Sequence, residues 1–300
     1  MMAAEYYIFT GMVGEVIPRH VTHVRIDKSL KVVPARAFYE HPNIEVVICH
    51  DKVERIEAEA FFYCPSLRRV IMPGVTIIER SAFFSCRALN DVECGKLEII
   101  VKWAFGSCSS LSSVDLPSIK IVEKSAFTGC RNLTHANFGK YLESIGGGAI
   151  RGGAFAFCRS LERITLPLKD GVIANDNIFQ GCVKLNSVEL VGGVHETVAA
   201  LLMEEWKNDM NKEIDAINRI LPNTYAGSAV FDVGGKAQAI RTWIRSVLRK
   251  IVHCKAEHRR YLNEAAATLQ STLPLPNEDI VIKNIIPFLE LPSYTFEGED

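Results

Sequence analysis

The sequence predicts an α/β repeat fold: a right-handed solenoid of short stacked units with a parallel β-sheet, followed by an α-helical C-terminal region. Three observations predict it. A phrase of Ala-Phe-x-x-Cys-x-x-Leu recurs along the first two thirds of the chain. Apolar residues alternate with period two after each copy, as in a half-buried strand. Beyond Leu190 the phrase stops and helical periodicity begins. Self-similarity at a fixed period indicates a repeat architecture.

A phenylalanine anchors every copy of the phrase. The five close copies and the two weaker flanking ones contain Phe61, Phe83, Phe105, Phe127 and Phe155, and Phe38 and Phe179. Successive phenylalanines from Phe38 to Phe179 are 23, 22, 22, 22, 28 and 24 residues apart. The interval of 28 is one unit plus six residues, which we place in a glycine-rich turn at 145–153. The regular spacing predicts about seven to eight units.

Each unit combines a strand with a return segment. The strand has the pattern Leu-x-x-Val-x-Leu, and a proline such as Pro117 ends it because proline cannot donate to a strand ladder. A second apolar group, such as Ile119 to Val122, turns the corner, and Ala-Phe-x-x-Cys forms a short helical or turn-rich return. One unit cannot bury its own apolar face, so we expect units to stack with each Phe against the Phe of its neighbours.

The combined pattern Ala-Phe-x-x-Cys-x-x-Leu-x-x-Val-x-Leu-Pro resembles the BspA-type, or Treponema-type, leucine-rich repeat over roughly residues 21–191. The departures are His41 in a Cys position and the Asn177-Ile178 start of the last unit, both typical of end repeats. The resemblance implies a leucine-rich-repeat solenoid used as a recognition surface, with no catalytic residues to carry over. The C-terminal block is similar to extensions on diatom proteins with this repeat.

Composition narrows the class of protein. The 300 residues carry 34 Lys and Arg against 35 Asp and Glu, so no global field favours nucleic acid or an anionic membrane. The first twenty residues lack a basic region before an apolar stretch, which predicts no signal peptide. The sequence contains no run of eighteen apolar residues, so it predicts no membrane-spanning helix. With nine cysteines, an odd number, we expect reduced thiols and a cytoplasmic or nuclear location.

The cysteines and glycines offer no convincing chemistry. Six cysteines share one repeat position, and we interpret them as small buried apolar residues. Their spacing lacks the paired pattern of a zinc site, and the glycines at 146–153 and 234–235 fit neither phosphate-loop motif. No nucleophile motif is present. We therefore expect no metal, no cofactor and no enzymatic activity.

The candidate binding surface is the concave face of the strands. Residues that alternate outward from the core form columns across neighbouring units. An apolar group that we expect to be exposed (Val46, Ile48 and Ile71) is the best candidate for contact with a protein partner, with ordinary cross-strand packing as the alternative. The full set of candidate residues is Val46, Ile48, Arg69, Ile71, Asp91, Glu93, Asp115, His135, Asn137 and Arg163. The acids among them either select a basic ligand or keep the face soluble.

The C-terminal third predicts two helices, one over residues 195–221 and one over 237–273. Residues 196–220 carry a charge of −3 and residues 236–260 a charge of +7, which predicts an acidic helix paired with a basic one. The second has an apolar seam that runs from Ile240 to Ala265 and includes His258 and Tyr261. We expect an N-terminal cap at 1–20, the solenoid at 21–192, a helical hairpin at 193–273, and a short helix with an acidic tail at 274–300.

Two functional hypotheses follow. The first is a non-catalytic scaffold that binds a protein partner on the concave face. The alternative is binding of nucleic acid, calmodulin or an anionic surface by the basic helix, whose candidate residues are Arg241, Arg245, Arg249 and Lys250. The hairpin would either cap the last repeat or pair with a second chain to form a homo-oligomer. The sequence does not identify the partner.

Overall fold

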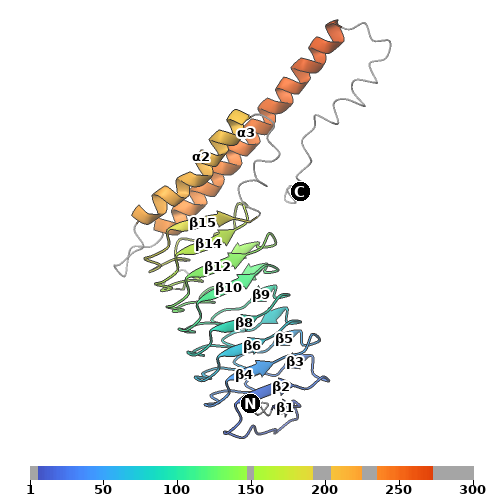
Figure 1. The fold of residues 1–300 in the computed structure, drawn as a ribbon, viewed down its shortest axis with the longest axis vertical. Helices are drawn as coiled ribbons and strands as arrows, with labels where there is room; N and C mark the ends of the chain where they lie inside the picture. Colours follow the sequence, from blue (N-terminus) through green and yellow to red (C-terminus); the bar gives the residue numbers. More distant parts are fainter. Residues whose placement is uncertain (1–5, 147–151, 192–203, 225–234, 273–300) are drawn as a thin grey trace, which may run out of the picture. The chain divides into compact units, whose positions relative to one another are not determined.

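The computed structural model describes residues 6–146, 152–191, 204–224 and 235–272 (Figure 1). Contacts divide the chain into two compact units. The first unit comprises Met1–Val191 with Ile217–Ile244, and the second comprises Gly192–Ala216 with Arg245–Asp300. Each is described here by itself.

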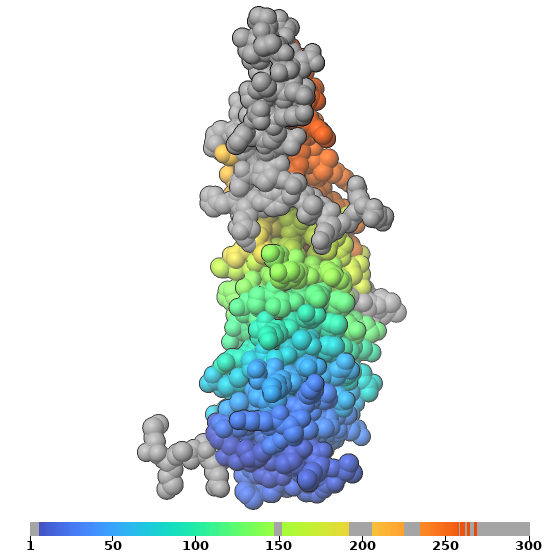
Figure 2. All heavy atoms as spheres, turned by 90° about the vertical axis from the view of Figure 1, so that its right-hand side faces the viewer, coloured from blue at the N-terminus to red at the C-terminus, as the bar shows by residue number. Residues whose placement is uncertain are grey.

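A parallel β-solenoid makes up most of the first unit, and its coils follow one another in sequence order (Figure 2). One strand per coil faces the same side, and every pairing between these strands is parallel. Five strands form one sheet and four form the next: β1 (Tyr7–Phe9), β2 (His23–Ile26), β4 (Val46–Ile48), β6 (Arg69–Ile71) and β8 (Asp91–Glu93), then β10 (Ser113–Leu116), β12 (His135–Phe138), β14 (Arg163–Leu166) and β15 (Ser187–Leu190). The predicted fold class is confirmed.

A second parallel sheet lines another side of the solenoid. Its six strands have two residues each: β3 (Val32–Val33), β5 (Arg55–Ile56), β7 (Ile77–Ile78), β9 (Ile99–Ile100), β11 (Ile121–Val122) and β13 (Ser144–Ile145). The sequence analysis interpreted these apolar groups only as corners. Two-residue strands are too short to show a period of two, so their pairing emerges only when the coils stack.

The third side consists of the Ala-Phe-x-x-Cys turns, and we call it the turn side. Its phenylalanine rings lie in the core in one continuous stack, from Phe38 to Phe179. Adjacent rings have centroids 4.7 to 6.0 Å apart and are nearly parallel, as the repeat spacing predicted. Phe9 of β1 extends the stack with a tilted ring 4.7 Å from Phe38. The stacked rings supply a large apolar area that no single unit can bury alone.

The six repeat cysteines do more than fill space. Each thiol lies 3.0 to 3.1 Å from the carbonyl oxygen of the stacked phenylalanine in the preceding coil, and donates to it. His41, at the Cys position of the first full unit, contacts the Pro18 carbonyl through Nε2 at 3.2 Å. The departure from the repeat therefore preserves a polar contact to the preceding coil. Burial raises the pKa of the Cys182 thiol to about 12, which leaves it uncharged and unreactive at neutral pH.

The N-terminal segment adds a strand to the first sheet. β1 pairs with β2, and a loop follows it. The Glu15 carboxylate accepts hydrogen bonds from the hydroxyls of Tyr7 and Thr10 and from the backbone of Thr10 and Met12. These bonds lower the pKa of Glu15 despite its partial burial. One carboxylate thus fixes the first coil, within the predicted cap at 1–20.

The C-terminal edge of the solenoid is covered by helical residues of the first unit. The side-chain oxygen of Asn218 accepts from the backbone N–H of Val188, on the edge strand β15, at 2.8 Å. Lys236 is buried and donates through Nζ to the carbonyls of Leu185 at 2.6 Å and Leu221 at 2.7 Å. Arg241 pairs with Asp176 of the last coil. Exposed sheet edges invite further pairing, so this cover closes the array.

The helices are α2 (Glu204–Ile220) and α3 (Gly235–Thr272), joined through a short 3-10 turn, η1 (Leu221–Asn223), and residues outside the description. In the second unit, Glu213 accepts from Lys250 and Ser246, and Trp206 lies near Tyr261. Glu213 lies after Trp206 in α2, whereas its partner Lys250 lies before Tyr261 in α3. The two helices are therefore antiparallel.

The predicted helical seam is correct in its first half. Ile240, Ile244, Val247 and Ile251 are buried. Tyr261, predicted to lie in the seam, has 45% of its surface exposed. Its ring lies at the surface, with its centroid 6.4 Å from that of Trp206 and 5.2 Å from the Arg260 guanidinium. The predicted helix start at 195 and the segment 274–300 lie outside the described residues.

Candidate interaction surface

The first sheet brings the predicted binding residues into two registered columns. In the five-stranded part, Val46 pairs with Arg69, and Arg69 with Asp91. In the second column Ile48 pairs with Ile71, and Ile71 with Glu93. In the four-stranded part the columns are formed by Ser113, His135, Arg163 and Ser187, and by Asp115, Asn137, Thr165 and Glu189. The structure therefore places all ten candidate residues on one face of the strands.

The apolar group of Val46, Ile48 and Ile71 is half-buried. The sequence analysis expected these side chains to be exposed, and this is a correction. Each strand has a registered neighbour on both sides, so side chains in a column cover much of one another. The three side chains still form a continuous apolar area on β4 and β6.

Next to this area lies an ion cluster centred on one arginine. Arg69 pairs with Asp91, with Nε 3.0 Å from Oδ2, and also with Glu93. These bonds and charges raise the pKa of Arg69. Farther along, Asn137 donates to Asp115 at 2.7 Å and Arg163 pairs with Glu189 at 3.1 Å. The acids of this face therefore have partners within the sheet.

The sheet breaks beside the same cluster. Among the described residues, β8 and β10 belong to different sheets and no strand pairing joins them. The 22-residue spacing sets Glu93 opposite Asp115, and like charges that face each other across strands repel. The turn side stays continuous here, because the N–H of Phe105 donates to the Ala126 carbonyl at 2.8 Å. The break is therefore local to the predicted binding face.

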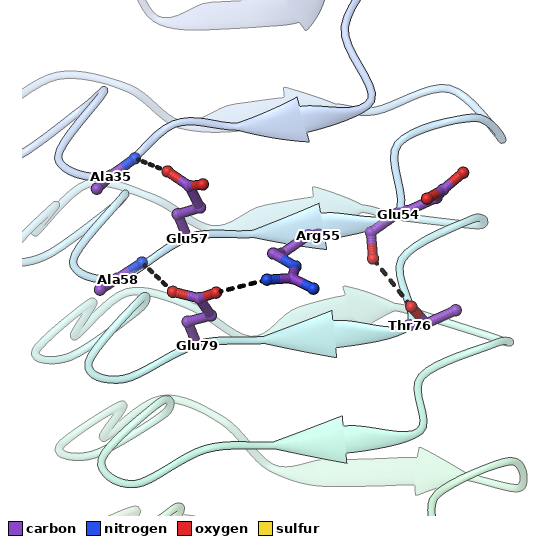
Figure 3. Close-up of polar contacts among 7 residues, drawn as sticks. All are labelled: Ala35, Glu54, Arg55, Glu57, Ala58, Thr76 and Glu79. Carbon is purple, nitrogen blue, oxygen red and sulfur yellow. Dashed lines mark hydrogen bonds and ion pairs between the residues drawn. The ribbon is translucent and has the colours of Figure 1, made fainter.

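A set of glutamates on the second sheet was missed by the sequence analysis. Glu57 accepts from the backbone N–H of Ala35 in the preceding coil at 2.8 Å, and Glu79 accepts from that of Ala58 at 3.2 Å (Figure 3). Glu79 also pairs with Arg55 at 3.3 Å. A glutamate directly after three of the six strands, at positions 57, 79 and 123, was the available signal. These carboxylates join coils and are structural.

The four candidate residues of the basic helix have different environments. Arg241 forms an ion pair with Asp176. Lys250 forms an ion pair with Glu213, with Nζ 2.5 Å from Oε2. Arg245 and Arg249 are exposed. Of the apolar residues that a calmodulin-type or lipid-surface helix would present, Trp243 and Val247 are buried and Val252 is exposed.

Among the described residues, no group of three or more His, Cys, Asp or Glu is arranged to hold a metal ion. Within the same residues, no helix has both the length and the apolar character to cross a membrane.

The fold and the registered strand face define a leucine-rich-repeat β-solenoid. The chain belongs to the BspA type leucine rich repeat family, whose model matches residues 31–152 and 147–201 in six copies. Proteins of this family are generally non-catalytic and serve protein interaction.

Solved structures and curated proteins were also compared. A leucine-rich repeat protein from Bacteroides ovatus is 30% identical over 49% of this chain and 37% of its own, with a TM-score of 0.44. The T. pallidum leucine rich repeat protein is 26% identical over 48% and 68%, with a TM-score of 0.41. The pneumococcal vaccine antigen PcpA is 18% identical over 62% and 65%, with a TM-score of 0.34. The chain thus spans little more than a third of the Bacteroides protein. No curated protein matches it.

Proposed function

We propose that this protein is a non-catalytic scaffold that binds another protein on the concave face of the solenoid, formed by β1, β2, β4, β6 and β8 and by β10, β12, β14 and β15. Two facts support the proposal. The repeat family generally serves protein interaction. The outward columns of the sheet also offer one surface on which residues from many coils meet a single partner.

The observation that carries the proposal is the apolar area of Val46, Ile48 and Ile71 beside the charged cluster around Arg69. An apolar centre with a charged rim is the usual anatomy of a protein interface. An arginine that is already held by two carboxylates keeps a defined position before a partner arrives, which lowers the entropy lost on binding.

The test compares two matched pairs of isoleucines. Proximity labelling with the wild-type chain would first identify a partner, and the affinity of the purified pair would then be measured. We expect Ile48→Lys with Ile71→Lys to weaken binding at least tenfold, because both side chains would lie in the interface.

The control is Ile77→Lys with Ile99→Lys. These residues are also half-buried and in register, but they lie on the second sheet. Thermal unfolding would verify that both variants fold. Equal binding by the wild type and the first variant, or equal loss in both variants, would refute the proposed site.

The basic helix is the weaker candidate. Its buried Trp243 and Val247 and the pairing of Arg241 and Lys250 leave less of it for an external ligand. No observation in the structure favours nucleic-acid, calmodulin or anionic-surface binding over the scaffold function.

A further inference from the structure

The turn side carries a second column of aromatic rings, outside the core stack. We call Tyr39, Phe62, Phe84 and Trp103 the aromatic strip. Tyr39 and Phe62 have ring centroids 5.0 Å apart, and Phe62 and Phe84 5.3 Å apart. Trp103 meets Phe84 edge-on at 5.7 Å. All four are half-buried, and they come from four consecutive coils.

A hollow lies at one end of the strip. It has a volume of about 220 Å³ and is lined by Phe62, Ser81, Phe84 and Trp103. The hollow is largely open to solvent, and its volume is comparable to that of one large apolar side chain. Gly106 makes the hollow possible, since a Cβ there would lie 2.8 Å from the ring of Phe84 and 3.0 Å from that of Trp103.

Trp103 occupies a position where the neighbouring coils use serine. The residue before Ala-Phe has a left-handed backbone in five coils, with φ of +57° at Ser81, +64° at Trp103 and +59° at Ser125. Bulky residues rarely adopt this conformation, which costs about 1–3 kcal/mol for a residue other than glycine. Arg36 and Glu59 have the same backbone in their coils, with φ of +60° each, so the conformation belongs to the repeat. Trp103 is distinguished by a bulky, half-buried ring outside the core stack, at a position where the neighbouring coils have serine.

The orientation of the rings favours one kind of ligand. Interplanar angles of 5° and 16° mean that Tyr39, Phe62 and Phe84 cover one another's faces. The Arg36 guanidinium lies over the Tyr39 ring, 4.6 Å from its centroid. These three rings therefore present their edges to the surface. Nucleic-acid bases and sugars stack on ring faces, so they would find little surface to bind here. Ring edges are electropositive and suit carbonyl and carboxylate oxygens.

Basic residues lie next to the hollow in the chain. Arg80, Lys102 and Lys124 occupy one repeat position in consecutive coils, and the first two directly precede Ser81 and Trp103, which line the hollow. Arg80 is paired with Glu59, which also pairs with Arg36, and Glu79 is paired with Arg55. Among the described residues, Lys102 and Lys124 form no ion pair. These two ammonium groups can therefore meet an acidic ligand.

We propose that the aromatic strip is a second docking surface, which takes an apolar side chain of an acidic peptide segment from a partner protein. The hollow holds the apolar side chain, and Lys102 and Lys124 contact the flanking carboxylates. This surface lies on the turn side and is separate from the concave face, so one solenoid can hold two partners or two parts of one partner.

The test uses the full chain and a fluorescein-labelled peptide of sequence Glu-Asp-Leu-Phe-Asp-Glu, with binding followed by fluorescence anisotropy. We expect Trp103→Ser to weaken binding at least tenfold. Serine is the native residue at this position in two neighbouring coils, so the variant should fold. Gly106→Val is a second variant, which fills the hollow instead of removing one wall, and we expect a similar loss.

Two controls separate this site from other surfaces. Tyr141→Ser removes an aromatic side chain that is 55% exposed away from the strip, and should leave binding unchanged. Ile48→Lys with Ile71→Lys should also leave it unchanged, which distinguishes this site from the concave one. Lys124→Glu should weaken binding, and added salt should have the same effect.

Three results would overturn the proposal. They are no binding of the peptide to the wild type, equal binding by the wild type and Trp103→Ser, and equal binding of a peptide with lysines in place of the acids. Tighter binding of a single-stranded oligonucleotide, lost in Trp103→Ser, would also overturn it and assign the strip to nucleic acid.

Discussion

Replacing Phe83 with alanine tests the stacked core directly. The Phe83 ring is fully buried, between Phe61 at 5.1 Å and Phe105 at 5.3 Å. Removing a buried phenylalanine destabilises a protein by about 3–5 kcal/mol. Two stacked pairs are lost together, each worth about 0.5–1.5 kcal/mol beyond burial. We therefore expect a loss in the upper half of the range, about 4–5 kcal/mol.

The neighbouring Phe84 provides the matched control. Its ring is half-buried on the turn side and stacks on Phe62 at 5.3 Å. Because part of the ring is already in water, Phe84→Ala should lose only about 1–2 kcal/mol. The two variants change the same residue type in the same coil and differ only in burial.

The position of Phe83 adds a second expectation. Its coil contains β8, which lacks strand pairing with β10 in the next coil. Stability in a repeat array depends on contacts between neighbouring units. The first sheet is already unpaired between these two coils. Loss of the Phe83 ring should therefore let the coils before the break and those after it unfold separately.

Urea denaturation followed by circular dichroism and by tryptophan fluorescence measures both effects. We expect two transitions in Phe83→Ala, with the probes no longer coincident, and one shared transition in Phe84→Ala. A single transition with a loss below about 2 kcal/mol, or a loss no greater than that of Phe84→Ala, would refute the argument.

Two further predictions concern the polar contacts that hold the coils. His41 is buried, its Nδ1 has no hydrogen-bond partner among the described residues, and burial lowers its pKa. The unfolded chain takes up this proton near pH 6.5 and the folded chain only at lower pH, so stability should fall as the pH drops below about 6.5. His41→Cys should remove this dependence and gain about 1 kcal/mol, and equal melting-temperature shifts between pH 7.5 and 5.5 in both proteins would contradict it. Lys236→Met should cost about 2 kcal/mol, because it removes charged hydrogen bonds to the Leu185 and Leu221 carbonyls. Hydrogen exchange at Val188 would then speed up as the cover loosens, and unchanged exchange would exclude this role.

The repeat spacing was sufficient to predict the core and the register. Once Phe61, Phe83 and Phe105 are 22 residues apart, every other position acquires a neighbour in the same place of the next coil. This is why the outward columns of the first sheet could be assigned correctly from the sequence. Their role in binding stays a prediction.

Features that depend on distances between coils could not be predicted. The thiol of Cys108 reaches the Phe83 carbonyl at 3.1 Å, and Glu57 reaches the Ala35 N–H, only because of the exact path of each turn. The exposure of Ile48 was overestimated because a period-two pattern separates inward from outward but does not measure cover by neighbours. The 22-residue spacing does set Glu93 opposite Asp115, but whether their repulsion breaks the pairing of β8 and β10 depends on the path of the chain.

Function in a repeat array should lie where a coil departs from its neighbours without serving the stack. His41 and Lys236 depart from the pattern, but both hold coils or the cover in place. Trp103 departs from serine, its half-buried ring lies outside the core stack, and it lines the hollow together with Phe84. The residues that disagree with the repeat and gain nothing in packing are therefore the first to examine for binding.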